Sequence, residues 1–189
     1  SMNIGFWAFN TAKPPFDQVK VRQALAHAIN RDAILQAVYF GHATAADSVL
    51  PPTSWAYNPN LTVQQYDPVK AKALLTEAGY PNGFSMDIWA MPVQRLYNPN
   101  AQKMAELIQA DLRAIGVKAR IVSYEWNTFR RKLRQGEHDS VLIGFSKSLP
   151  ANAIPTTLVL DKNGAVAGRI SGIVTIASLS ELIEKIKSE

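Results

Sequence analysis

The side chains that could act in catalysis or bind a metal are few in this chain of 189 residues. Its three histidines, His27, His42 and His138, are far apart and lack the spacing that brings two imidazoles to one metal. Each is expected on the surface or on a helix face. The carboxylates form no motif that pairs two of them: Asp32, Glu77, Asp87, Glu125 and Asp139. We therefore predict no metal site and no acid–base pair.

Other kinds of catalysis are excluded by composition and motif. The chain has no cysteine, so disulfide bonds, thiolate metal sites and thiol–disulfide exchange are excluded. It also has no glycine-rich phosphate loop and no Gly-x-Ser-x-Gly motif. We predict that the protein is not an enzyme and requires no cofactor.

Basic residues raise the question of a nucleic-acid partner, because the formal net charge is +5. The dense group consists of Arg130, Arg131, Lys132 and Arg134. No nucleic-acid motif or aromatic stacking platform accompanies it, so a solvated helix face explains the group better. No apolar run reaches the ~18–20 residues needed to cross a bilayer. We expect neither a nucleic-acid nor a membrane partner.

The elements that would position a site alternate along the chain. A strand over 3–10 is followed by helices that begin at Asp17 and Asn30. The pairs Asp67-Pro68 and Asn98-Pro99 each predict a helix with an N-cap residue and proline at the first position. Strands are predicted over 84–90, 117–124 and 138–145, and a helix over 126–135. This order indicates crossover units and a largely parallel sheet.

The pattern changes after residue 145. Residues 146–153 are small and polar, as in a linker. Apolar runs over 158–160 and 166–170 flank Asn163-Gly164, which predicts a hairpin. Ser178 and Glu181 fit a capping box that begins an amphipathic final helix.

Long, ordered matches in the first three quarters carry a family resemblance. They include Val21-Arg22-Gln23-Ala24, Glu77-Ala78-Gly79-Tyr80-Pro81-Asn82-Gly83-Phe84, Trp89-Ala90-Met91-Pro92-Val93-Gln94-Arg95, Tyr97-Asn98-Pro99-Asn100, Tyr124-Glu125-Trp126 and Gly136-Glu137-His138. Residues 3–145 thereby resemble the second lobe of bacterial dipeptide-binding proteins, in family 5 of the extracytoplasmic solute-binding proteins.

The resemblance implies two ligand-binding residues. Arg95 matches the arginine that holds the peptide's terminal carboxylate, a task suited to a planar bidentate donor. Trp126 would line the ligand cavity. The alternatives are a surface arginine in a proline-rich loop and a core aromatic at a helix start. The family's aspartate for the ligand's amino group has no counterpart, since Ser146-Lys147 takes its place.

Residues 151–189 resemble something else, the C-terminal half of a thioredoxin-like fold from periplasmic thiol oxidoreductases. Ile154-Pro155-Thr156-Thr157 matches its cis-proline entry, although the sequence leaves the isomer of this bond open. The fold class expected is α/β: a three-layer sandwich whose mostly parallel sheet is completed by this hairpin and helix. Residues 1–145, a seam over 146–153, and 154–189 would fold as one domain.

Joining two incomplete folds suggests an engineered chimera without native activity. The alternative is a weak peptide or small-molecule binding module, from the solute-binding protein of a peptide ABC transporter. The parent proteins would be periplasmic. Ser1-Met2 starts the chain without a signal peptide, so recombinant cytoplasmic expression is expected. The chain would be a monomer or a weak homodimer.

Overall fold

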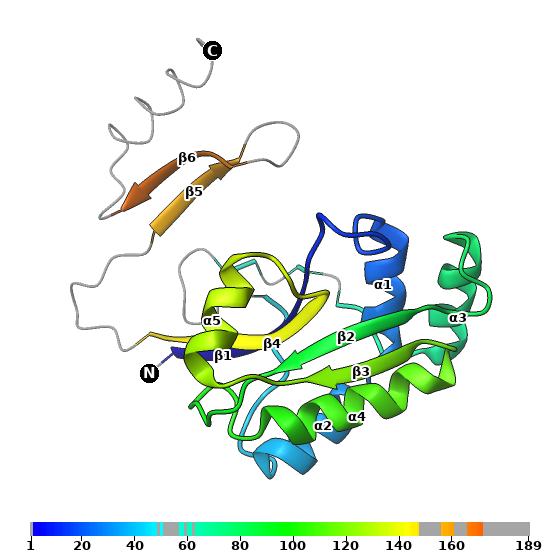
Figure 1. The fold of residues 1–189 in the computed structure, drawn as a ribbon, viewed down its shortest axis with the longest axis horizontal. Helices are drawn as coiled ribbons and strands as arrows, with labels where there is room; N and C mark the ends of the chain where they lie inside the picture. The colour runs from blue at the N-terminus through cyan, green and yellow to red at the C-terminus, as the bar shows by residue number, and fades with distance from the viewer. Residues whose placement is uncertain are drawn as a thin grey trace. The chain divides into compact units, whose positions relative to one another are not determined.

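Figure 1 presents the protein as a computed structural model. The structure describes residues 2–48, 50, 57–58, 60–61, 63–147, 156–160 and 166–171. The chain divides into two units, residues 2–147 and the part that follows residue 147. Each unit is described by itself.

The first unit alternates helices and strands in nearly the predicted order. Its elements are β1 (Met2–Phe9), α1 (Val19–Ala28), α2 (Arg31–Tyr39), α3 (Pro68–Glu77), β2 (Ser85–Ala90), α4 (Ala101–Ala114), β3 (Lys118–Val122), α5 (Trp126–Arg134) and β4 (Ser140–Lys147). No helix in the described ranges is long and apolar enough to cross a bilayer.

Side-chain caps fix where several helices begin. Asn30 accepts a hydrogen bond from the Ala33 amide at the start of α2, and Asp67 accepts one from Lys70 at the start of α3. Both caps were predicted. The prediction that Asn98 caps the next helix is wrong, because Asn100 caps α4 through the Lys103 amide. Asn98 is instead almost fully buried in the turn before the helix.

The four strands form one mixed sheet in the order β1-β4-β2-β3. β2 runs parallel to both β3 and β4, while β1 is antiparallel to β4. The connection through α4 leads from β2 to its neighbour β3. The connection through α5 leads from β3 back past β2 to β4 (Figure 1). Right-handed crossovers in opposite directions put α4 and α5 on opposite faces of the sheet.

The core lies on both faces of the sheet. Successive side chains of a strand point to opposite faces, so Ile88 and Trp89 of β2 point into different halves of the core. Trp89 contacts Phe129 of α5, with ring centroids 5.6 Å apart. Ile88 points to the other face, where α1 and α4 supply buried side chains such as Leu25 and Ile108. A mixed α/β architecture with a mostly parallel sheet is therefore confirmed.

The second unit contains the antiparallel pair of β5 (Thr156–Leu160) and β6 (Val166–Ser171). Both strands match the predicted hairpin, and they form a sheet of two strands. β4 includes the first two residues of the predicted seam, 146 and 147. The rest of the seam, the Ile154–Pro155 bond and the final helix lie outside the described residues. The single domain joining both segments stays a prediction.

Candidate ligand-binding site

The carboxyl ends of β2 and β3 meet at one edge of the sheet, and the chain leaves them in opposite directions. After β2 it leads to α4 on one face, and after β3 it leads to α5 on the other. In open α/β sheets, the region beyond the strand ends at such a divergence is where ligands bind. Arg95 lies in the loop after β2, and Trp126 begins α5 shortly after β3. The topology therefore directs both predicted residues to this edge.

Arg95 and Trp126 are in contact. The guanidinium carbon of Arg95 lies 4.9 Å from the centre of the Trp126 ring, which is cation–π geometry. Arg95 is exposed and Trp126 is half-buried, stacked on the buried Phe129 with centroids 5.7 Å apart. The Arg95 Nη1 group donates to the Gln94 carbonyl at 3.2 Å. An aromatic surface thus holds an exposed guanidinium that can still donate to a ligand.

A tight turn positions Arg95. The backbone amides of Arg95 and Asn98 each donate to the other residue's carbonyl at 3.0 Å. The side chain of Asn98 is buried, and its Oδ1 accepts a hydrogen bond from the Asn100 amide at 3.1 Å. Its Nδ2 group lies 3.5 Å from the sulfur of Met104 in α4. The turn is therefore attached to the start of α4.

Tyr97 attaches the same turn to the sheet. Its side chain is buried, and its carbonyl accepts a hydrogen bond from the Tyr39 hydroxyl at 2.8 Å. The space beside it exists because Gly5 and Gly144 have no side chains. Sequence reasoning identified the motif around Tyr97 but missed this role, since nothing along the chain brings residues 5, 97 and 144 together.

Two further cationic side chains lie near the rings of Trp126 and Tyr124. Arg130 of α5 has its guanidinium carbon 5.9 Å from the centre of the Trp126 ring. Lys132 lies 5.3 Å from the Tyr124 ring and also forms an ion pair with Glu137. Both residues belong to the helix face that the sequence predicts to be solvated, and Arg130 is exposed there. The prediction did not include their contacts with the Trp126 and Tyr124 rings.

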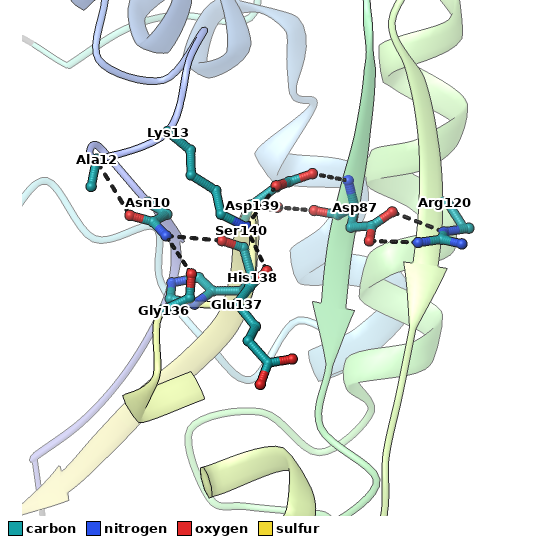
Figure 2. A network of polar contacts seen from close by, with 10 residues as sticks. All are labelled: Asn10, Ala12, Lys13, Asp87, Arg120, Gly136, Glu137, His138, Asp139 and Ser140. Atoms are coloured by element: carbon teal, nitrogen blue, oxygen red, sulfur yellow. Dashed lines mark hydrogen bonds and ion pairs between the residues drawn. The ribbon is translucent and has the colours of Figure 1, made fainter. Parts of the chain in front are cut away.

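The opposite edge of the sheet carries a polar network instead (Figure 2). Asp139 accepts a hydrogen bond from the Asp87 amide at 3.0 Å, and the Asp87 carboxylate pairs with Arg120 through two bonds of 2.9 and 2.8 Å. The hydrogen bond to Asp87 raises the pKa of Arg120 further above its usual value. A hollow of about 550 Å³ borders these residues. The two carboxylates meet in one network, which the sequence did not indicate.

Asn10 and Lys13 join this network to β1. The Asn10 Nδ2 group donates to the carbonyls of Gly136 and His138 at 2.9 and 3.1 Å, and Lys13 lies 3.4 Å from Asp139 (Figure 2). Every partner is a backbone group or an opposite charge. The arrangement thus holds β1 to the start of β4 and suits a structural role better than catalysis.

The three histidines have unrelated surroundings. His27 is buried in α1, with Nδ1 2.7 Å from the Gln65 carbonyl oxygen. His42 is exposed. His138 is half-buried beside Trp89, and burial lowers its pKa below the usual value. Within the described ranges, no three potential metal ligands cluster together.

Comparison with known proteins identifies the family. A protein-family model described as "Bacterial extracellular solute-binding proteins, family 5 Middle" matches residues 1–165. A dipeptide-binding protein of Escherichia coli is 53% identical over 145 residues, which are 77% of this chain and 27% of that protein. The heme-binding protein A of Haemophilus influenzae is 52% identical over 77% of this chain and 26% of its own length. The chain thus spans about a quarter of these relatives.

Solved structures agree with the sequence relatives. A dipeptide-binding protein from a Pseudoalteromonas species, in complex with Met-Leu, has a TM-score of 0.76 and 61% identity over 78% of this chain and 29% of its own. A protein of Haemophilus parasuis, HbpA2, has a TM-score of 0.76 and 46% identity over 77% of this chain and 29% of its own. The fold is that of a lobe of a periplasmic binding protein.

These matches correct the main functional prediction. The hypothesis of an engineered chimera without native activity is wrong, because relatives about half identical over three quarters of the chain are named binding proteins. Their names also agree with the expectation of a binding protein rather than an enzyme. With its family match covering residues 1–165, the chain belongs to family 5 of the bacterial extracellular solute-binding proteins.

Proposed function

We propose that the protein binds short peptides beyond the carboxyl ends of β2 and β3, with Arg95 holding the terminal carboxylate and Trp126 lining the site. The observation that carries this proposal is the contact of Arg95 with Trp126 at 4.9 Å. An exposed guanidinium fixed over an indole offers a planar pair of donors, which matches the geometry of a carboxylate.

The ligands named for several relatives share this chemistry. Met-Leu is bound by the Pseudoalteromonas protein, and mannopinic acid by a protein that is 32% identical with a TM-score of 0.66. A dipeptide and an organic acid both present a carboxylate, as do the propionates of heme. A shared carboxylate-binding group would serve such different ligands. Other parts of each site would then distinguish one ligand from another.

Trp126 and the turn at Tyr97 preorganise the arginine. Each side chain ordered on binding costs about 0.5–1.5 kcal/mol, so a guanidinium already held over a ring loses less freedom. The ring face also attracts the cation without consuming its N–H donors.

The biological setting that we propose is peptide transport in the periplasm. Relatives 39–40% identical are named periplasmic proteins of an ABC transporter or of peptide transport.

The resemblance of residues 154–189 to a thioredoxin-like fold also stays a proposal, supported by the β5–β6 hairpin at the predicted positions. Hydrogen exchange over 172–189 would test its predicted final helix.

A titration with Met-Leu tests the carboxylate site. Backbone amide shifts followed by NMR are expected to change around residues 91–98 and 124–130, and the C-terminal amide of Met-Leu is expected to bind at least about tenfold more weakly. Loss of a bidentate charged contact costs ~1.5–3 kcal/mol, which is roughly tenfold or more. Equal binding of the acid and the amide would refute the role of Arg95.

Matched variants separate the site from general charge. Arg95→Lys keeps the charge but loses the planar pair of donors, so binding is expected to weaken. Arg120→Lys makes the same change at the opposite edge of the sheet and is expected to leave binding unchanged. Equal weakening by both variants would contradict a local role for Arg95.

A further inference from the structure

Two guanidinium groups from separate elements lie against one indole ring. Arg95 comes from the loop after β2, with its guanidinium carbon 4.9 Å from the Trp126 centroid. Arg130 comes from α5, with its guanidinium carbon 5.9 Å from the same centroid. The loop and the helix converge only through the fold, so the second arginine belongs to the surroundings of the first.

Neither guanidinium is neutralised by a neighbour in the part of the chain that the structure describes. The ion pairs found there join Lys13 to Asp139, Lys20 to Glu77, Lys103 to Glu106, Arg120 to Asp87 and Lys132 to Glu137. Arg95 and Arg130 have no carboxylate within 4 Å among the described residues.

The acidic residue nearest to Arg130 in sequence, Glu125, forms hydrogen bonds with the backbone instead. Glu125 precedes Trp126, and its carboxylate accepts hydrogen bonds from the amides of Asn127 at 3.0 Å and Thr128 at 3.2 Å. It caps the N-terminus of α5. The first free amides of the helix are therefore occupied, and an anion reaching this place would meet the arginine side chains rather than the backbone.

Like charges that share a ring repel each other unless an anion lies near both. We propose that Arg130 is a second anion-binding residue of this site, so that the protein prefers peptides with an acidic side chain on the C-terminal residue. The terminal carboxylate would pair with Arg95 and the side-chain carboxylate with Arg130. This inference rests on the proposed peptide-binding function and specifies its substrate preference.

The position of Arg130 on α5 explains why it, rather than its neighbour, would act. Residues four apart lie on the same side of a helix, so Arg130 projects over Trp126. Arg131 is one position further and therefore about 100° around the helix, away from the ring. Arg131 is exposed like Arg130, which makes it a control of equal charge.

The test compares the dipeptides Ala-Glu and Ala-Gln, both with a free terminal carboxylate, by NMR titration at low salt. The wild-type protein is expected to bind Ala-Glu about two- to fivefold more tightly, as for a partly exposed ion pair. Arg130→Gln is expected to abolish this preference while still binding Ala-Gln. Arg131→Gln removes the same charge and is expected to keep the preference.

The possible outcomes distinguish the role of Arg130 from the proposed peptide-binding function. Binding of Ala-Gln without any gain for Ala-Glu would overturn the role of Arg130 and leave the peptide site standing. A preference that survives in Arg130→Gln, or that falls equally in Arg131→Gln, would also overturn it. Absence of binding by both dipeptides would overturn the proposed function together with this inference. Circular dichroism of each variant checks that the fold is intact.

Discussion

Gly5 of β1 and Gly144 of β4 lie directly opposite each other, and Tyr97 occupies the space that their missing side chains leave. A Cβ atom on Gly144 would lie 2.6 Å from Cδ2 of Tyr97 and would also clash with the Ile4 carbonyl. A Cβ atom on Gly5 would clash with the Tyr97 carbonyl. Because Tyr97 belongs to the turn that holds Arg95, two glycines far away in sequence help to position the arginine that we propose binds the ligand.

Gly144→Ala should therefore reduce both stability and binding. Overpacking a filled space costs about 1–3 kcal/mol in the free energy of unfolding, and the displaced Tyr97 would move Arg95. Urea unfolding and the Met-Leu titration measure the two effects. Gly5→Ala disturbs the same turn, so the double variant should lose less than the two single losses together. Strictly additive losses would show that the two glycines act independently.

Tyr39→Phe tests the other attachment of this turn. The variant removes the hydroxyl that donates to the Tyr97 carbonyl at 2.8 Å and leaves that carbonyl without this partner. The expected loss is about 1 kcal/mol in the free energy of unfolding, measured in urea. Tyr66→Phe is a suitable control because Tyr66 is 48% exposed, and it should change stability by less than about 0.5 kcal/mol. Equal losses would argue against the hydrogen bond.

Local chemistry allowed much of the fold to be predicted from the sequence. Asn30 and Asp67 cap helices because their side chains reach amides three residues on, a relation within one turn of chain. The same reasoning failed at Asn98, where burial and the reciprocal bonds with Arg95 outweigh the pattern of asparagine followed by proline. The start of α4 thus depends on tertiary contacts, which local rules do not contain.

The site was predictable only in part for the same reason. Arg95 and Trp126 were singled out by family resemblance, and the order of strands explains why they meet. The contributions of Gly5 and Gly144 depend on distances across the fold. The proximity of Arg130 to Trp126 follows from their spacing of four residues on α5, but only the fold brings Arg95 from the loop after β2 to the same ring.

Asp139→Ala and Arg120→Gln should separate structural from surface interactions at the opposite edge. The Asp139 carboxylate accepts a hydrogen bond from the Asp87 amide at 3.0 Å. Removing this carboxylate leaves the partly buried amide without its acceptor. The expected loss is about 1–3 kcal/mol in the free energy of unfolding. Arg120 is 77% exposed, so its ion pair is screened by water and its loss should have a much smaller effect. A larger effect from Arg120→Gln in urea unfolding would contradict this order.

His138 should make stability depend on pH. Burial, and then the charge of Lys13, lowers the pKa of His138 in the folded protein, while Asp139 opposes this shift. Since the unfolded pKa is about 6.5, the unfolded chain takes up the proton first as pH falls. The contribution of neutral His138 is therefore present above about pH 6.5 and is lost as pH falls through the folded pKa. Its ring lies beside Trp89, with centroids 5.9 Å apart, so a protonated ring would be poorly solvated there.

Replacing His138 should flatten this dependence. The difference between the free energies of unfolding at pH 7 and pH 5, measured in urea, is expected to be smaller in His138→Gln than in the wild type. His42→Gln replaces an exposed histidine and is the matched control; an equally large change there would contradict a specific role of His138. Lys13→Gln removes the nearby positive charge and should raise the pKa of His138, followed by NMR of the imidazole protons. An unchanged pKa in Lys13→Gln would mean that burial, and not the charge of Lys13, lowers the pKa of His138.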